Sequence, residues 1–220
     1  MTLRIGITMR VVESNIYSER RNALSVAWSE YLTGLFPEAL VIPLPNKADN
    51  VENMIGKLNI TGIILSNGND WGEAPERDET ERQIVNYCIR RDLPVFGVCR
   101  GLQAINILFG GTLEVNMESR IKETHVTEKH EIKIVCKPFD RWSNNEKIFV
   151  NSFHKQGVLV EGLSKELKAF AIAGSGVVEG LFHPQKPFLA VQWHPERKSP
   201  SSSYDRLLIT RFFEGGIFWN

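Results

Sequence analysis

The sequence is poor in cysteine and contains no long hydrophobic segment. Its 220 residues include three cysteines, Cys88, Cys99 and Cys136, and this odd, sparse set does not suit a disulfide framework but indicates a reducing compartment. No apolar run approaches the roughly 20 residues that a membrane-spanning helix needs. The first residues, Met1–Thr8, lack the long apolar region of a signal peptide and are expected to form a strand. We therefore expect a cytoplasmic protein that does not bind or cross a membrane.

An excess of charge of either sign is also lacking. The chain has 26 basic and 26 acidic residues and a formal net charge of zero, which argues against a general nucleic-acid or anionic-membrane binder. No residues are spaced as metal ligands, and no phosphate-binding glycine loop occurs, so no metal and no cofactor are expected. Repeats and low-complexity linkers are missing as well, and we expect a single domain over residues 1–220.

The first half of the chain alternates strand and helix patterns. Strands are expected at Leu3–Thr8, Ala39–Ile42, Gly62–Leu65 and Val95–Val98. Helices are expected at Ala23–Phe36, Val51–Lys57, Glu79–Arg90 and Leu102–Phe109. Such alternation predicts an α/β fold with a mostly parallel central sheet and helices on both faces. In such sheets ligands bind at the carboxyl ends of the strands.

The second half changes to alternating polar and apolar residues, the pattern of half-buried antiparallel strands. Strands are expected at His130–Cys136, Lys147–Val150, Leu167–Ile172 and Val177–Phe182, and a final helix near Ser203–Phe213. We therefore expect a small antiparallel β extension beside the parallel sheet.

The segment Pro94–Gln103 predicts a strand, a sharp turn with Cys99 at the bend, and a helix. Gly97 and Gly101 flank the cysteine at minus and plus two, where glycine lets the backbone turn tightly and lets helix and strand approach closely. The positive end of the helix dipole favours a nucleophilic thiolate. A buried structural cysteine at a turn is the alternative interpretation. A residue elsewhere in the sequence that can activate the thiol favours the catalytic interpretation over the structural one.

That partner occurs in Phe188–Glu196, which begins as a strand and ends in His194-Pro195-Glu196. The proline biases His194 toward extended backbone, so His194 and Glu196, two residues apart, can face the same side. A carboxylate beside an imidazole fixes its tautomer and stabilises its charged form. Cys99, His194 and Glu196 therefore predict a nucleophile, its general base and acid, and an orienting group.

These segments resemble the class I glutamine amidotransferase superfamily, whose triad is Cys-His-Glu and whose fold is flavodoxin-like, and the resemblance covers nearly the whole chain. Cys99-Arg100-Gly101 is similar to the γ-glutamyl hydrolase, or peptidase-like, branch. Arg77-Asp78-Glu79-Thr80-Glu81 and Val150–Gln156 resemble two further segments of that branch. The resemblance implies that Asn151, Ser152 and His154 line the substrate site and that Gln103 helps hold the glutamyl group. A solely structural role for Gln103 or His154 remains an alternative.

Ser66–Asp70 occupies the position of the oxyanion loop of the superfamily, which usually carries a Gly-Gly pair. Asn67 replaces the first glycine, and asparagine tolerates left-handed backbone better than most residues. We expect the backbone amides of Gly68 and Arg100 to form the oxyanion hole, with Asn67 on the substrate side. Two roles are open for the Arg100 side chain: binding an anionic leaving group, or forming a structural ion pair.

The resemblance implies a cysteine-dependent hydrolase that releases glutamate from a small γ-glutamyl amide through a thioester. Ser66–Asp70 and Glu76–Glu81 resemble members of surface-polysaccharide pathways, such as capsule synthesis, where the leaving group would be nucleotide-linked, for instance a cytidine diphosphate amidate. The alternatives are a glutaminase subunit that passes ammonia to a synthetase partner, and a non-enzymatic member that kept the fold. Whether the chain forms a homodimer is left open.

Overall fold

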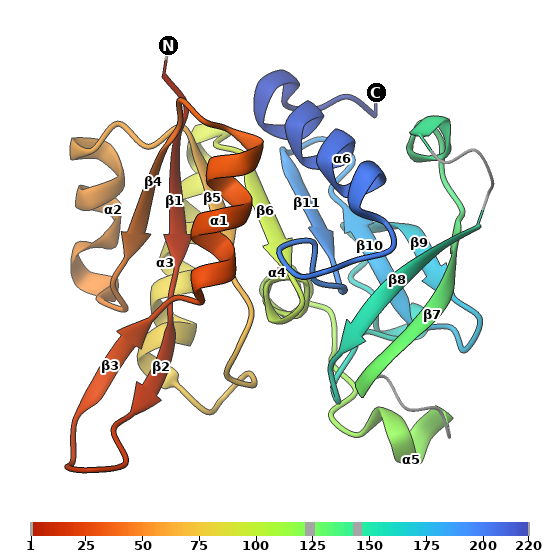
Figure 1. The fold of residues 1–220 in the computed structure, drawn as a ribbon, viewed down its shortest axis with the longest axis horizontal. Helices are drawn as coiled ribbons and strands as arrows, with labels where there is room; N and C mark the ends of the chain where they lie inside the picture. Colours follow the sequence, from red (N-terminus) through yellow and green to blue (C-terminus); the bar gives the residue numbers. More distant parts are fainter. Residues whose placement is uncertain (1, 122–125, 143–146, 220) are drawn as a thin grey trace.

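The structure is a computed structural model that describes residues 2–121, 126–142 and 147–219. One sheet of nine strands runs across these residues in the order β4-β1-β5-β6-β11-β10-β9-β7-β8 (Figure 1). Its strands are β1 (Arg4–Thr8), β4 (Leu40–Leu44), β5 (Gly62–Leu65), β6 (Val95–Val98), β7 (Val126–Ile134), β8 (Lys147–Phe153), β9 (Lys168–Ala173), β10 (Val178–Phe182) and β11 (Phe188–Val191).

The first five strands of that order are all parallel. β1 pairs with β4 and β5, β5 with β6, and β6 with β11, each in parallel register. From β11 onward the pairs β11–β10, β10–β9, β9–β7 and β7–β8 are antiparallel. The expected mostly parallel central sheet with an antiparallel extension is therefore confirmed, and both parts belong to one sheet.

Helices cover both faces of the sheet. The helices are α1 (Val26–Leu35), α2 (Ala48–Lys57), α3 (Pro75–Arg91), α4 (Arg100–Leu108), α5 (Met117–Ile121) and α6 (Ser202–Gly215), with short 3-10 turns at Phe139–Trp142 and Val160–Gly162. In the view of Figure 1, α1 and α6 lie in front of the sheet, and α3 and α4 lie behind it. None of the helices among the described residues combines the length and the apolarity that a membrane crossing requires.

Strand alternation divides the apolar side chains into two cores, one under each helical layer. Ile64 and Phe96 pack with Trp28 of α1 and Leu208 of α6. Their chain neighbours point the opposite way: the second core contains Ile63, Leu65, Val51, Ile55, Ile84, Val85, Leu102 and Ile105. The central parallel strands β5, β6 and β11 are buried on both faces, which explains their uninterrupted apolar sequences, whereas the edge strand β4 is partly exposed.

The sequence placed most elements within a few residues of their observed bounds and missed a hairpin. β5 and β6 coincide with the expected ranges, whereas Ala23, expected to begin a helix, ends a strand. It belongs to β3 (Arg20–Ala23), which pairs with β2 (Arg10–Glu13) in a separate antiparallel ribbon. This hairpin projects from the end of β1 (Figure 1). Its strands were missed because they are short and β3 contains no apolar alternation.

The helix after β6 packs unusually close to the sheet, and glycine makes this approach possible. A Cβ atom on Gly101 would lie 2.1 Å from the backbone oxygen of Leu65 in β5. A Cβ atom on Gly97 would lie 2.8 Å from the backbone carbonyl carbon and oxygen of Gly101. The two glycines therefore set the height of α4 over β5 and β6, and with it the position of the turn between β6 and α4.

We expect Gly101→Ala to destabilise the fold, because the new methyl group meets backbone atoms that cannot rotate away. The loss in unfolding free energy should reach about 3 kcal/mol, the upper range for overpacking. Thermal and urea unfolding would measure it. Gly34→Ala is the matched control: Gly34 lies in α1 with no atom within 4 Å of its would-be Cβ, and alanine there should stabilise the helix by about 0.5–1 kcal/mol. Equal stability of the two variants would contradict the packing argument.

Candidate active site

Cys99 stands at the turn between β6 and α4 in a strained backbone conformation. Its φ is 55° and its ψ −105°, values that a non-glycine residue adopts only when the surrounding structure imposes them. The Cys99 amide donates to the carbonyl of Val191 in the neighbouring strand β11, at 2.8 Å. Its side chain is 8% exposed and lines a cavity at the carboxyl ends of the parallel strands. The elbow expected from the sequence is therefore present.

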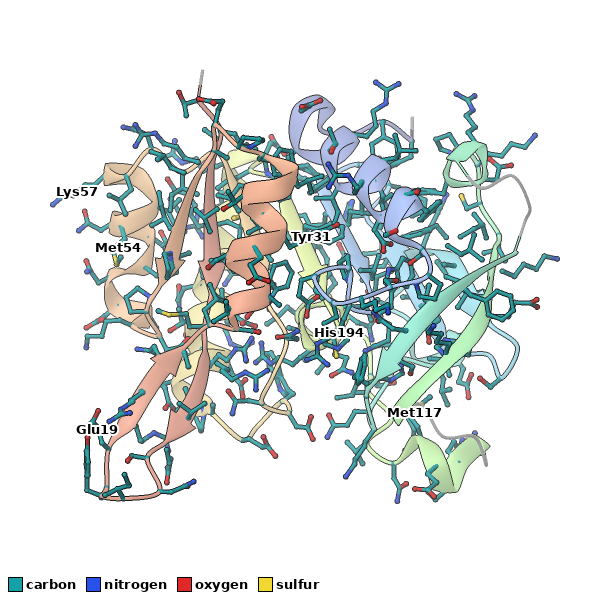
Figure 2. The ribbon with its side chains drawn as sticks, viewed as in Figure 1. Glu19, Tyr31, Met54, Lys57, Met117 and His194 are labelled. Atoms are coloured by element: carbon teal, nitrogen blue, oxygen red, sulfur yellow. The ribbon has the colours of Figure 1, made fainter. Side chains whose placement is uncertain are left out.

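His194 and Glu196 follow β11 and lie beside the elbow. His194 Nδ1 is 2.8 Å from Glu196 Oε1, and both side chains are buried. The carboxylate accepts the Nδ1 proton, which leaves Nε2 as the nitrogen that can exchange a proton with a reacting group. The Nε2 atom of His194 is buried and has no hydrogen-bond partner among the described residues. His194 lies at the lower ends of the central strands, between the two halves of the sheet (Figure 2).

The charge on Cys99 controls the protonation of His194. Burial alone would lower the pKa of His194, but interaction with the Cys99 thiolate, and then with Glu196, raises that pKa to about 9. Cys99 and His194 line the same cavity. A histidine with a raised pKa is protonated near neutral pH and can act as the acid for a leaving group.

The backbone of His194 is fixed by Asn151 of β8. Asn151 Oδ1 accepts from the His194 amide at 2.8 Å, and Asn151 Nδ2 donates to the His194 carbonyl at 2.9 Å. Asn151 was expected to bind substrate, and the structure corrects this: its amide is used by the protein itself. Ser152, also expected at the substrate, is buried and does not line the cavity. Side chains alternate along a strand, so Asn151 and Ser152 face opposite sides of β8, and neither reaches the cavity.

The loop after β5 carries Asn67 and Gly68 into the cavity. Asn67 Nδ2 lies 2.5 Å from Glu196 Oε1 and 2.8 Å from His194 Nδ1. Since Nδ1 carries the proton shared with Glu196, the amide donates to the carboxylate and helps to orient it. Asn67 lines the cavity as expected, but its side chain braces Glu196. Gly68 has φ +85°, a conformation in which a side chain would be strained.

A buried arginine holds this loop by its carbonyl groups. Arg77 of α3 donates to the carbonyl oxygens of Ser66 at 2.7 Å and Asn67 at 3.1 Å, and also to that of Gly68. Its Nε donates to Glu81 at 3.0 Å. The carbonyls point toward Arg77, and neither the Gly68 amide nor the Arg100 amide donates to another described residue. That these two amides bind an oxyanion stays a prediction.

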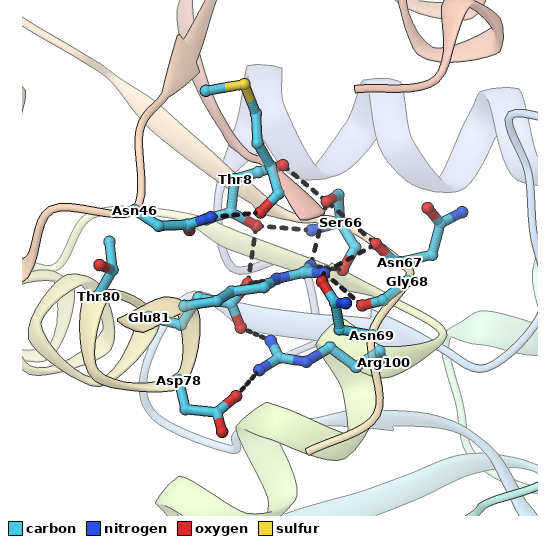
Figure 3. Close-up of polar contacts among 12 residues, drawn as sticks. Thr8, Asn46, Ser66, Asn67, Gly68, Asn69, Asp78, Thr80, Glu81 and Arg100 are labelled. Atoms are coloured by element: carbon cyan, nitrogen blue, oxygen red, sulfur yellow. Dashed lines mark hydrogen bonds and ion pairs between the residues drawn. The ribbon is translucent and has the colours of Figure 1, made fainter. Parts of the chain in front are cut away.

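The Arg100 side chain forms structural ion pairs. Its guanidinium contacts Glu81 and Asp78 of α3, all three side chains being buried or nearly so (Figure 3). The guanidinium also lies 5.2 Å from the ring centre of Trp71. Of the two roles that the sequence left open, the ion pair is the one observed. Glu81 also accepts from Thr8 of β1 at 2.9 Å, so one strand, β1, and two helices, α3 and α4, meet at this carboxylate.

The cavity at Cys99 has a volume of about 260 Å³, enough for a glutamyl group but not for a whole nucleotide-linked substrate. Gln103 lies on its wall and donates through Nε2 to the Gln156 carbonyl at 2.9 Å. His154 also lines the cavity, with Nδ1 2.9 Å from the same carbonyl. Six lining residues were not named as site residues by the sequence argument: Arg10, Asn69, Asp70, Phe153, Lys155 and Arg197. Arg197 follows directly after Glu196, and Phe153 and Lys155 flank His154, so these three residues adjoin predicted site residues in the sequence. No local sequence signal indicates Arg10.

No group of three or more His, Cys, Asp and Glu side chains that could hold a metal ion occurs in residues 2–121, 126–142 and 147–219. The arrangement supports acyl transfer by a thiolate with an imidazole as acid and base, oxyanion donors in the backbone, and an orienting carboxylate.

Comparison with known proteins identifies relatives of this chain. The family model for peptidase C26 matches residues 4–196. The chain is 29% identical to the γ-glutamyl-CDP-amidate hydrolase of Campylobacter jejuni, over 89% of this chain and 90% of that protein. It is also 29% identical to the γ-glutamyl-γ-aminobutyrate hydrolase of Escherichia coli O157:H7, over 86% and 76% of the respective lengths. The structure of a glutamine amidotransferase of Thermotoga maritima shares the fold, with a TM-score of 0.66 and 12% identity over 97% of this chain and 84% of that one.

We expect the pKa of His194, near 9 in the wild type, to fall in Cys99→Ala, because the thiolate is the largest of the influences that raise it. A raised pKa means that this pair stabilises the fold fully below pH ~6.5 and loses that contribution as pH rises through about 9. Hydrolysis should decline over the same alkaline range as imidazolium is lost. NMR titration of the histidines would test this, with His183, whose pKa burial lowers, as the internal control. A His194 pKa that does not respond to Cys99→Ala would contradict the ion pair.

Asn67→Ala removes one donor from Glu196 and should reduce kcat/KM by about tenfold, the value of one charge-assisted hydrogen bond. The effect should appear in kcat, because the contact orients His194 and Glu196. Steady-state kinetics with one γ-glutamyl amide would measure it. Asn53→Ala, at an exposed position of α2, is the matched control. Wild-type kcat in the Asn67 variant would remove the orienting role.

Proposed function

The chain belongs to the peptidase C26 family, and we propose that it hydrolyses γ-glutamyl amides through a thioester on Cys99. Relatives in this family act as hydrolases on γ-glutamyl compounds. The observation that supports the mechanism is the strained Cys99 elbow beside His194, whose Nδ1 is held 2.8 Å from Glu196 in the same cavity.

In the first half of the proposed reaction, the Cys99 thiolate attacks the γ-carbonyl carbon and forms a C–S bond. The carbonyl oxygen becomes an oxyanion, which the amides of Gly68 and Arg100 are placed to stabilise; one such donor typically contributes about 2.7–4 kcal/mol to the barrier. As the tetrahedral intermediate collapses, the C–N bond breaks. His194 Nε2 gives its proton to the leaving nitrogen.

In the second half, the now neutral His194 takes a proton from water as the water oxygen attacks the thioester. The C–S bond breaks, glutamate leaves, and the thiolate–imidazolium pair forms again. Glu196 remains ionised throughout and stabilises the imidazolium in each half. The chemistry of the cycle requires no group beyond the protein and water.

The glutamyl group is proposed to bind beside Gln103. The Gln103 Nε2 is used by Gln156 and also lies 3.3 Å from Gln192 Oε1. Its carbonyl oxygen accepts no hydrogen bond from a described residue, so it can accept one from the α-amino group. His154 is proposed to line the acceptor side of the same cavity.

For the leaving group, we propose a nucleotide-linked amidate released in the cytoplasm during capsule polysaccharide synthesis. Similarity to the Campylobacter jejuni hydrolase over 90% of that protein supports this choice. The cavity holds only the glutamyl end, so the remainder of such a substrate would extend over its rim.

The test is glutamate release from glutamine, γ-glutamyl-γ-aminobutyrate and γ-glutamyl-CDP-amidate by the isolated protein. We expect turnover without any partner, fastest with the amidate, and a loss of at least about 10³-fold in Cys99→Ala. Cys136→Ser, at a half-buried cysteine outside the cavity, is the control. Intact-mass measurement should find one glutamyl group bound to the wild type and none bound to Cys99→Ala. Activity on glutamine alone, and only when a synthetase is added, would support the ammonia-delivering alternative instead.

A further inference from the structure

The cavity at Cys99 carries more positive than negative charge. Four cationic side chains line it, Arg10, Arg100, Lys155 and Arg197, against one acidic lining residue, Asp70, among the described residues. Arg100 is neutralised by its contacts with Asp78 and Glu81. The excess therefore belongs to Arg10, Lys155 and Arg197, and an excess of cations in a partly closed cavity attracts an anionic ligand.

Arg10 is held over the oxyanion loop without an acidic partner. It begins β2, and its neighbour Val11 is fixed by two bonds with the Asn69 side chain, at 2.8 and 3.1 Å. Its guanidinium fills the space above Gly68, where a Cβ would lie 2.5 Å from Arg10 Nε. Among the described residues no carboxylate lies within ion-pair distance of Arg10. Burial, and then Arg77 and Arg197, lower the pKa of Arg10, whereas Cys99 and Glu196 oppose this shift.

Arg197 approaches the cavity from the His194 side. Its amide donates to the His194 carbonyl at 3.2 Å, and its guanidinium lies 4.6 Å from the ring centre of Phe153. Phe153 in turn packs edge-on against the His194 ring, with centroids 5.5 Å apart. Arg197 Nε is 3.5 Å from Glu196 Oε1, a contact that Glu196 shares with His194 and Asn67. The one carboxylate within ion-pair distance of Arg197 among the described residues is thus also engaged by two other groups.

The position of these two arginines identifies the part of the substrate that they meet. His194 protonates the leaving nitrogen, so the leaving group must lie on the His194 side of Cys99. Arg197 packs on that side, and Arg10, which lies against Gly68, lines the same cavity as Arg197 and Cys99. Two mutually repelling guanidinium groups are stabilised when an oxyanion binds between them, and the planar donors of arginine suit a phosphoryl group.

We propose that Arg10 and Arg197 form an anion subsite for the leaving group, and that the natural substrate is a γ-glutamyl amide whose amine carries a phosphoryl group. The inference rests on the proposed hydrolysis of γ-glutamyl amides and names the residues that select among them. Lys155 supplies a third cation at the rim of the same cavity. A dianionic group gains more from this subsite than a carboxylate does, because its two negative charges balance both guanidinium groups, whereas a carboxylate carries one charge.

The test uses three substrates that differ only in the end of the leaving amine: the γ-glutamyl amides of 2-aminoethylphosphonate, β-alanine and propylamine. We expect wild-type kcat/KM to decrease in that order, with about 100-fold between the first and the last. In Arg10→Gln and in Arg197→Gln, the ratio of phosphonate to propylamide kcat/KM should fall by about tenfold or more. Arg21→Gln is the matched control, because Arg21 lies in the same hairpin, exposed and bonded to Glu19 and Tyr17, and should keep the wild-type ratio.

An equal loss on all three substrates would overturn the proposal, because it would assign the arginines to the glutamyl group or to the fold. Wild-type hydrolysis of all three without preference would overturn it as well, while leaving the proposed hydrolase function intact. If none of them were hydrolysed, the hydrolase function would fail, and calorimetry with free 2-aminoethylphosphonate would decide the subsite separately. Binding to wild type that weakens in both variants supports the subsite; no binding, or equal binding, overturns it.

Discussion

The site depends on one buried cluster of charges that joins the oxyanion loop to the elbow. Arg77 binds the carbonyl groups of the loop after β5 and pairs with Glu81, and Glu81 also pairs with Arg100, the first residue after Cys99. The two amides proposed as oxyanion donors thus belong to segments fixed by the same carboxylate. Buried ion pairs add little net stability when compared with apolar packing, so we interpret this cluster as positioning rather than stabilising. Preorganised donors are what an oxyanion site requires.

The second requirement, a histidine in the correct position, is met from the antiparallel half of the sheet. Asn151 of β8 binds both polar backbone groups of His194, and Asn67 from the parallel half braces Glu196. The nucleophile is thus supplied by the parallel strands, whereas its base is held from both halves. This explains why the antiparallel extension joins the same sheet: it brings β8 alongside the segment that follows β11.

Sequence patterns predicted the parts of the fold and site that depend on local chemistry. The apolar runs of β5 and β6, the glycines around Cys99 and the His-Pro-Glu segment are local signals, and the structure brings these residues together. The roles of other site residues depend on contacts between segments that lie far apart in the sequence. From the sequence, Asn151 was expected to bind substrate. In the structure the side-chain amide of Asn151 instead hydrogen-bonds to the backbone of His194. Arg10 was not anticipated, because its position depends on a hairpin held by Asn69 and by the pairing of Arg20 with Glu76, contacts between residues far apart in the chain.

The way in which Arg77 holds the loop after β5 has an evolutionary consequence. It binds main-chain oxygens, which every amino acid possesses, so its own hold on this loop does not depend on the side chains at positions 67 and 69. The side chains at these two positions are therefore free to make other contacts. In this chain Asn67 supports the triad through Glu196, and Asn69 holds the hairpin through Val11. Mutational drift in such a loop can produce new specificity without dismantling the catalytic apparatus.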